Sequence, residues 1–245
     1  MLRGFWKLTW VETKVFLREP MGVIGTLVIP VVFFIALGRS GGAGTTETGS
    51  LPQLPFNVPI LAALLISVGA VTSLVAIISI YREGGILKRL RATPLSPVTI
   101  LGAHVFIKLA FTLIGLGLLV FAGRQIIPGA MDVNLPSFAA ALLLSTLSIL
   151  SLGFVIASLV PTARFAQPIS AALLYPMIAV SGLFVPIERL ARPLQLIALG
   201  LPTTHAVALM EGIWDGAGWR LTSAGALIVV FGVCTGLSAR VFRWE

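Results

Sequence analysis

Long apolar runs recur along this chain and limit what it can fold into. Six runs are long enough to cross a membrane, and the whole sequence is 57% hydrophobic, only 11% charged, with a mean hydropathy of +1.03. About 20 apolar residues, rising 1.5 Å each in a helix, cross a bilayer core of about 30 Å. We therefore expect an all-α polytopic membrane protein with six transmembrane helices, at approximately residues 21–37, 58–81, 98–121, 137–160, 168–185 and 221–239.

Two connections between these runs differ in character. Residues 39–57 are rich in Gly, Thr and Pro, which is typical of a flexible loop. The connection between the fifth and sixth runs instead contains two apolar pieces, "LQLIALGL" and "HAVALMEGIW", separated by Pro202. Each piece is too short to span, so we expect short re-entrant or interfacial helices there.

Basic residues outnumber acidic ones by 17 to 9, for a net charge of +8. In so apolar a chain this excess reports topology, because bases accumulate in cytoplasmic loops, and we expect no nucleic-acid partner. With a cytoplasmic N-terminus, eleven of the 17 bases fall inside, five outside, and Lys108 lies within the third run. We therefore expect a multi-pass protein of the plasma membrane with both termini cytoplasmic. The first 20 residues mix bases and acids unlike a signal peptide, so we expect no cleavage.

The N-terminal segment, residues 2–19, predicts an amphipathic interfacial helix. At about 100° per residue, its bases fall within about 60° of one helical face, and its aromatic residues occupy the adjoining broad face. Such a helix lies along the membrane surface with its rings at headgroup depth. It is either a topology anchor alone or a surface helix that also contacts a cytoplasmic partner. The bases are Arg3, Lys7, Lys14 and Arg18; the apolar face holds Phe5, Trp6, Trp10, Phe16 and Leu17.

The stretch "REGGILKRLRATPLSP", residues 82–97, has more structure than a topology signal needs. Gly84 and Gly85 end the helix that leaves the second run. A short amphipathic helix follows, with its apolar residues on one side, and "TPLSP" stops it. This cytoplasmic segment is either a rigid handle for a partner protein or a plain anchored loop.

The same stretch resembles the E-x-G-x-L-(K/E)-x-L-x-x-(T)-P-(L/V)-(S) loop of ABC-2 type transporter permeases. The resemblance covers nearly the whole chain, including the N-terminal helix, the six runs, "SGLFVP" at residues 181–186 and "LPTTHAV" at residues 201–207. One departure is Glu211, which stands where many members of the family carry arginine.

The resemblance implies the membrane subunit of an exporter driven by separate ATPase subunits, paired with a second permease copy or a paralogue in a prokaryotic inner membrane. The loop and the N-terminal helix would dock on the ATPase. The sequence has no G-x-x-x-x-G-K-[ST] phosphate loop, so we expect no enzyme activity or cofactor in this chain alone, with ATP and Mg bound by the ATPase partner. The implied coupling residues are Arg82, Glu83, Leu87, Lys88, Arg89, Leu90 and Arg91, with Arg3, Lys7, Lys14 and Arg18.

Polar residues within the runs are further candidates. Lys108 shares one helical face with His104, and a charge in a span costs at least about 2.5 kcal/mol. Lys108 either pairs structurally or takes part in transport. The resemblance suggests further pathway positions, and an outer gate or structural network in the last connection, where we recognise no metal site. The pathway candidates are Ser67, Thr72, Ser73, His104, Lys108, Tyr175, Met177 and Ser181; the gate candidates are Glu188, His205 and Glu211.

The leading functional hypothesis is export of an amphiphilic small molecule, such as a drug, an antibiotic or a lipid-like compound, as in multidrug efflux. Relatives that export polysaccharides are an alternative, although aromatic residues for sugar stacking are sparse, at 9%. A proton-coupled secondary transporter using His104 and Lys108 is another alternative. A membrane-embedded enzyme would need a clustered nucleophile, base or metal set, and the sequence suggests none.

Overall fold

The computed structural model describes residues 2–18, 24–28, 31–32, 35–36, 58–85, 97–126, 133–160, 162–182 and 185–241. Within these ranges every regular element is a helix, and no strand occurs. The predicted all-α class is therefore confirmed for the described residues. Most of the predicted first span, residues 21–37, and residues 86–96 of the predicted coupling loop lie outside them.

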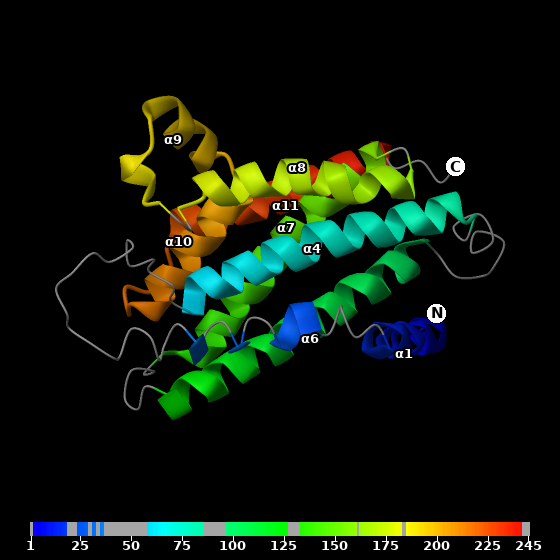
Figure 1. Cartoon of the computed structure of the whole chain (residues 1–245), viewed down its shortest axis with the longest axis horizontal. Coiled ribbons are helices and arrows are strands. Elements are labelled where there is room, and N and C mark those ends of the chain that lie inside the picture. The colour runs from blue at the N-terminus through cyan, green and yellow to red at the C-terminus, as the bar shows by residue number, and fades with distance from the viewer. Residues whose placement is uncertain are drawn as a thin grey trace.

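Five long helices run side by side along the long axis of the molecule (Figure 1). They lie at the positions of the predicted second to sixth spans. Helix α7 occupies the centre, because it packs against α4, α10 and α11, and α8 covers another side of α4. Their bounds are α4 Val58–Glu83, α6 Pro97–Ile126, α7 Leu135–Leu159, α8 Ala163–Val180 and α11 Leu221–Val241.

Length and composition identify three membrane-crossing helices among the described residues: Gly102–Ala122, Leu135–Leu159 and Leu221–Ser238. The pair Arg192–Leu199 and Pro202–Trp214 is bent by 79° and raises this number to four if it counts as one broken span. The protein is therefore polytopic and helical, while the count of six spans stays a prediction.

Both ends of α7 follow from local sequence. At its start, the Asn134 Oδ1 atom accepts a hydrogen bond from the Ser137 N–H at 3.1 Å, which caps the first turn. At its end, the Ala157 carbonyl would normally accept from residue 161, but Pro161 has no N–H. The last turn of α7 therefore needs a donor from elsewhere in the chain.

The connection between α8 and α11 folds into short helices, at the positions expected for short re-entrant or interfacial helices: η2 (Ile187–Arg189), α9 (Arg192–Leu199) and α10 (Pro202–Trp214). Helix α10 is part of the core, with Leu209 and Met210 at 0% exposure, and it packs against α7, α11 and α4. Helix α9 is mostly exposed. This connection forms one end of the bundle (Figure 1).

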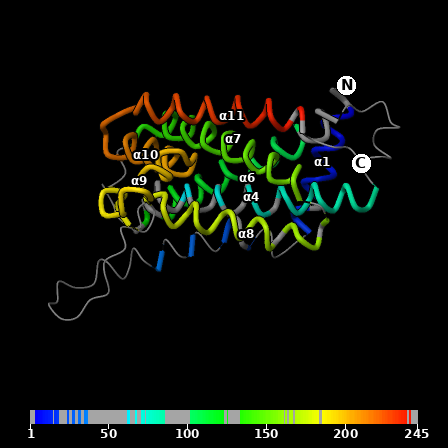
Figure 2. The backbone as a smooth tube through the Cα atoms, turned by 90° about the horizontal axis from the view of Figure 1, so that it is seen from above, coloured from blue at the N-terminus to red at the C-terminus, as the bar shows by residue number. Residues whose placement is uncertain are grey.

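The N-terminal helix α1 (Leu2–Arg18) lies at the opposite end and packs against α6. Its axis runs across the direction of the long helices: Figure 1 shows it foreshortened, and Figure 2, turned by 90°, shows it lengthwise. This orientation suits a helix that lies in the membrane plane while its neighbours cross the membrane. The short segment η1 (Ile24–Val28) also packs against α6.

Candidate functional site: the junction of α1, α4 and α6

Aromatic side chains join α1 to α6. The Phe5 and Phe106 rings meet edge to face at 5.9 Å between centroids, and Phe16 packs on Phe111 at 4.2 Å. These contacts lie three turns apart on α1, so the whole inner face of the helix is held against α6. Of the predicted aromatic face of α1, Phe5 and Phe16 are turned toward α6, while both tryptophans are exposed.

A carboxylate on the same inner face joins α1 to two helices at once. The Glu12 Oε1 atom accepts a hydrogen bond from the Tyr81 hydroxyl of α4 at 2.6 Å. The His104 Nε2 atom of α6 lies 3.5 Å from the same oxygen, and the Tyr81 and His104 rings meet edge to face at 5.5 Å. Both Glu12 and His104 side chains are largely buried, at 12% and 7% exposure. We call Glu12, Tyr81 and His104 the junction triad.

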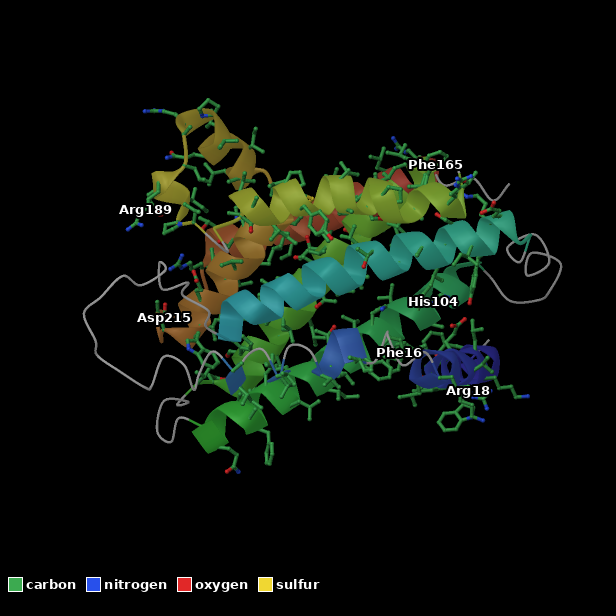
Figure 3. All side chains as sticks on the ribbon, viewed as in Figure 1. Phe16, Arg18, His104, Phe165, Arg189 and Asp215 are labelled. Atoms are coloured by element: carbon green, nitrogen blue, oxygen red, sulfur yellow. The ribbon has the colours of Figure 1, made fainter. Side chains whose placement is uncertain are left out.

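Lys108 lies one turn beyond His104 on α6. Its Nζ atom is 5.3 Å from the centroid of the Phe16 ring of α1, within the range of a cation–π contact. Figure 3 shows His104 and Phe16 at this same end of the bundle. The predicted shared face of His104 and Lys108 is therefore the face that α1 covers. Whether Lys108 is structural or takes part in transport stays a prediction.

The junction triad brackets the loop at residues 82–97. Tyr81 directly precedes the loop, and His104 lies in the second turn of the helix that follows it. Helix α4 ends at Glu83, and Gly85 turns the chain with φ of +65°, as the Gly84-Gly85 pair predicted. A single side chain of α1, Glu12, thus contacts both helices that hold the loop.

The first residue of that loop closes the end of α7. The Arg82 Nη2 atom donates to the Ala157 carbonyl at 2.7 Å and to the Val160 carbonyl at 2.6 Å. Helix C-terminal carbonyls lack intrahelical partners and carry partial negative charge, so a guanidinium is well suited to them. Arg82 was predicted to contact an ATPase subunit; the structure shows its guanidinium bound to α7.

The other predicted coupling residues are only partly described. Lys7, Lys14 and Arg18 are exposed on α1, and Glu83 is exposed at the end of α4. The side chain of Arg3 and the loop residues from 86 to 96 lie outside the described part of the chain, and so do the predicted contacts of Leu87, Lys88, Arg89, Leu90 and Arg91.

The predicted pathway residues of α4 and α8 have mixed surroundings. Ser67 and Ser181 are buried, and each donates within its own helix, to the carbonyls of Ala63 at 2.7 Å and Ile178 at 2.8 Å. Tyr175 is 66% exposed on α8. Their role in lining a pathway stays a prediction, as it does for the half-buried Thr72 and Met177 and for Ser73, whose side chain is not described.

At the far end of the bundle, the predicted gate residues lie on different elements. The His205 Nε2 atom is 2.9 Å from the Leu199 carbonyl and so joins α10 to the end of α9. Glu188 is exposed in η2, and Glu211 is half-buried in α10. A gating role stays a prediction. Within the described ranges, no three His, Cys, Asp or Glu residues gather closely enough to hold a metal ion.

Sequence reasoning missed Glu12 and Tyr81 as site residues. One signal was available, because Glu12 is the single acid in α1 and lies on the side of the helix opposite its bases. An acid on the packed side of a surface helix calls for a polar partner, since burying an unpaired charge is costly. That signal predicts a partner, but it does not identify Tyr81.

A helical bundle with several membrane-length helices, and a transverse helix across one end, defines a polytopic membrane protein. The ABC-2 type transporter family model matches residues 3–213, and the chain belongs to this family. The resemblance drawn from its motifs is thereby confirmed. Members are membrane components of transport systems, so this chain is a membrane transport permease.

Two curated relatives have the same printed name, "Inner membrane transport permease YhhJ", from Escherichia coli K12 and from Shigella flexneri. Each is 27% identical over 142 residues, which is 57% of this chain and 38% of the relative. The match therefore spans well under half the length of the relatives.

Proposed function

We propose that the chain is the permease subunit of an ATP-driven exporter of amphiphilic small molecules, coupled to separate ATPase subunits through α1 and the loop at 82–97. The observation that carries this proposal is the junction triad. Glu12 ties α1 to Tyr81 and His104, on the two helices that hold the loop.

The junction suggests how movement of the loop would spread. A load from closing ATPase subunits would displace the adjoining ends of α4 and α6. Helix α1 would follow through Glu12, and α7 would follow through the two hydrogen bonds of Arg82. Packed helices move as rigid bodies, so a displacement at this end would reach the opposite end of the bundle.

Family membership supports the remaining parts of the proposal. The working unit would contain two permease chains, either identical or paralogous, and two ATPase subunits that bind ATP and Mg. Both termini would be cytoplasmic, as the positive-inside bias predicts, in a bacterial inner membrane. Multidrug efflux is the expected type of transport, because the bundle is apolar and offers few aromatic rings for sugars.

The test compares the two tyrosines of the chain, Tyr81 in the junction and the exposed Tyr175 on α8. Tyr81→Phe removes one hydroxyl and its bond to Glu12. A hydrogen bond to a charged group contributes about 1.5–3 kcal/mol, so we expect substrate transported per ATP hydrolysed to fall about tenfold in proteoliposomes containing the ATPase subunits. Glu12→Ala should have the same effect.

Tyr175→Phe is the matched control, and it should leave this ratio unchanged. The proposal is wrong if no ATPase subunit co-purifies with the wild-type chain from native membranes. The coupling role of the junction is wrong if both Tyr81→Phe and Glu12→Ala transport as wild type does.

One observation favours the second candidate, a proton-coupled secondary transporter. The spans contain no acid, but α1 supplies Glu12 at 3.5 Å from His104, which is a pair that could exchange a proton. Transport that survives ATP depletion and stops when the proton gradient is collapsed would support this candidate. Transport that requires ATP and is indifferent to the gradient would exclude it.

A further inference from the structure

The side of α1 that faces away from α6 combines exposed indoles with bases. Trp6 and Trp10 are 56% and 61% exposed, which is unusual for side chains of this size. The Lys14 Nζ atom lies 5.1 Å from the Trp10 ring centroid, so the bases and the rings form one surface. We call this surface the outward face of α1; it consists of Trp6, Lys7, Trp10, Lys14, Leu17 and Arg18.

The charge on the outward face has one sign. Glu12 is the single acid in α1, and it points inward to accept the hydrogen bond from Tyr81. Lys7, Lys14 and Arg18 are all exposed on the opposite side. Whatever covers the outward face therefore meets positive charge without a compensating acid from this helix, and a negatively charged surface is complementary to it.

The outward face is continuous with the exposed side of a membrane-crossing helix. The Trp6 ring meets the Phe106 ring edge to face at 5.7 Å, and Phe106 is 41% exposed on α6. Phe106 belongs to the membrane-length segment Gly102–Ala122. Exposed apolar side chains continue along this segment at Leu113, Ile114, Leu118 and Phe121.

This continuity sets the depth of α1. Because Trp6 lies beside the first turns of a span, the indoles of the outward face are at the boundary between headgroups and hydrocarbon, where Trp and Tyr are enriched. The transverse course of α1 in Figures 1 and 2 keeps the whole helix near that depth. A soluble protein partner would have to enter the bilayer boundary to cover these rings.

We propose that the outward face of α1 is a binding surface for anionic phospholipids. Lys7, Lys14 and Arg18 would bind the negatively charged headgroups, and Trp6 and Trp10 would sit just below them. Each base near an anionic membrane surface contributes about 1 kcal/mol, so three bases suffice for a clear preference over zwitterionic lipid. The inference assigns these bases to lipid rather than to an ATPase subunit, and it does not depend on ATP coupling.

The test measures which lipid surrounds the two indoles in nanodiscs made of 70% phosphatidylcholine and 30% phosphatidylglycerol. Two preparations have this same composition, with bromine, which quenches tryptophan, on the acyl chains of one lipid or of the other. Subtracting the signal of the Trp6→Phe/Trp10→Phe variant isolates the quenching of Trp6 and Trp10. Per brominated lipid present, we expect phosphatidylglycerol to quench about twofold more than phosphatidylcholine.

The variant Lys7→Gln/Lys14→Gln/Arg18→Gln should bring this ratio to about one, and raising the salt concentration should lower it in the wild type, because exposed charges are screened. The matched control, Arg189→Gln/Arg192→Gln in η2 and α9, should leave it unchanged. Equal quenching by both lipids in the wild type would overturn the inference. So would a charge-neutral variant that keeps the lipid preference but loses an ATPase subunit, since the bases would then belong to a protein partner.

Discussion

The two ends of the bundle are held together in different ways. At the junction, polar side chains connect segments far apart in the sequence, as when Tyr81 donates to Glu12, 69 residues away. At the η2–α9–α10 end, polar contacts are mostly short-range: Gln195 donates to the Leu190 carbonyl at 2.9 Å, and His205 lies on the Leu199 carbonyl. There, burial of α10 in the core supplies the long-range attachment.

The difference teaches what each end can do. Apolar burial holds an element strongly but without direction, so α10 is expected to move with the core. A few directional hydrogen bonds hold α1 at a defined position, and they can break and re-form when a partner moves the loop. The junction is therefore the end where a conformational signal would enter, and the opposite end follows the helices.

The largest effect expected from this contrast is in α10. Leu209 is fully buried, and Leu209→Ala should lower the free energy of unfolding by about 2–5 kcal/mol, because it leaves a cavity in the core. Denaturation of the purified protein in mixed micelles, followed by circular dichroism, measures this change. Leu199→Ala, at a residue of α9 that is 57% exposed, should change stability by no more than about 0.5 kcal/mol. Equal losses at the two positions would show that α9 is also held by burial.

An intermediate effect is expected at Arg82. Arg82→Met keeps the apolar stem but frees the Ala157 and Val160 carbonyls, and it should cost about 2–3 kcal/mol of stability in the same assay. Arg82→Lys should recover only part of this loss, since an ammonium lacks the planar fork that reaches both carbonyls. Arg240→Met, at an exposed base near the end of α11, is the control. A stability unchanged by Arg82→Met would separate the loop from α7.

The smallest effect concerns the two histidines of the chain, one at each end. His104→Ala removes a buried ring from beside Tyr81 and Glu12, and it should lower stability by about 1–2 kcal/mol. His205→Ala removes one short-range contact to the Leu199 carbonyl and should cost less than about 1 kcal/mol. The ratio of transport to ATP hydrolysis should fall only for His104→Ala. A fall for His205→Ala would instead support a gate at the far end.

Much of the helical architecture could be predicted from the sequence, because apolar length and punctuation are local signals. The runs beginning near residues 58, 98 and 137 became α4, α6 and α7, and Gly84 with Gly85 ended α4 where expected. The short apolar pieces around Pro202 became α9 and α10 for the same reason. Length alone could not show that α10 is buried in the core, since that depends on its neighbours.

The contacts of the candidate site were harder to predict, because they join distant segments. Lys108 and His104 could be placed on one face, but the helix that covers this face was not identifiable from spacing. Pro161 marks an unpaired carbonyl at Ala157, yet nothing local names Arg82, 75 residues earlier, as its donor. Periodicity grouped Trp6 and Trp10 with Phe5 and Phe16, and only packing on α6 separates the exposed rings from the buried ones.

The proline that follows α7 also sets an order of assembly during synthesis. Arg82 leaves the ribosome 75 residues before Ala157, so at about 5–20 residues per second its guanidinium waits roughly 4 to 15 seconds for the carbonyls it binds. Glu12 and Tyr81 are both present before that point, so the contact between α1 and α4 can form first. The nascent chain thus builds one end of the bundle early and fastens it to the central helix only when α7 is complete.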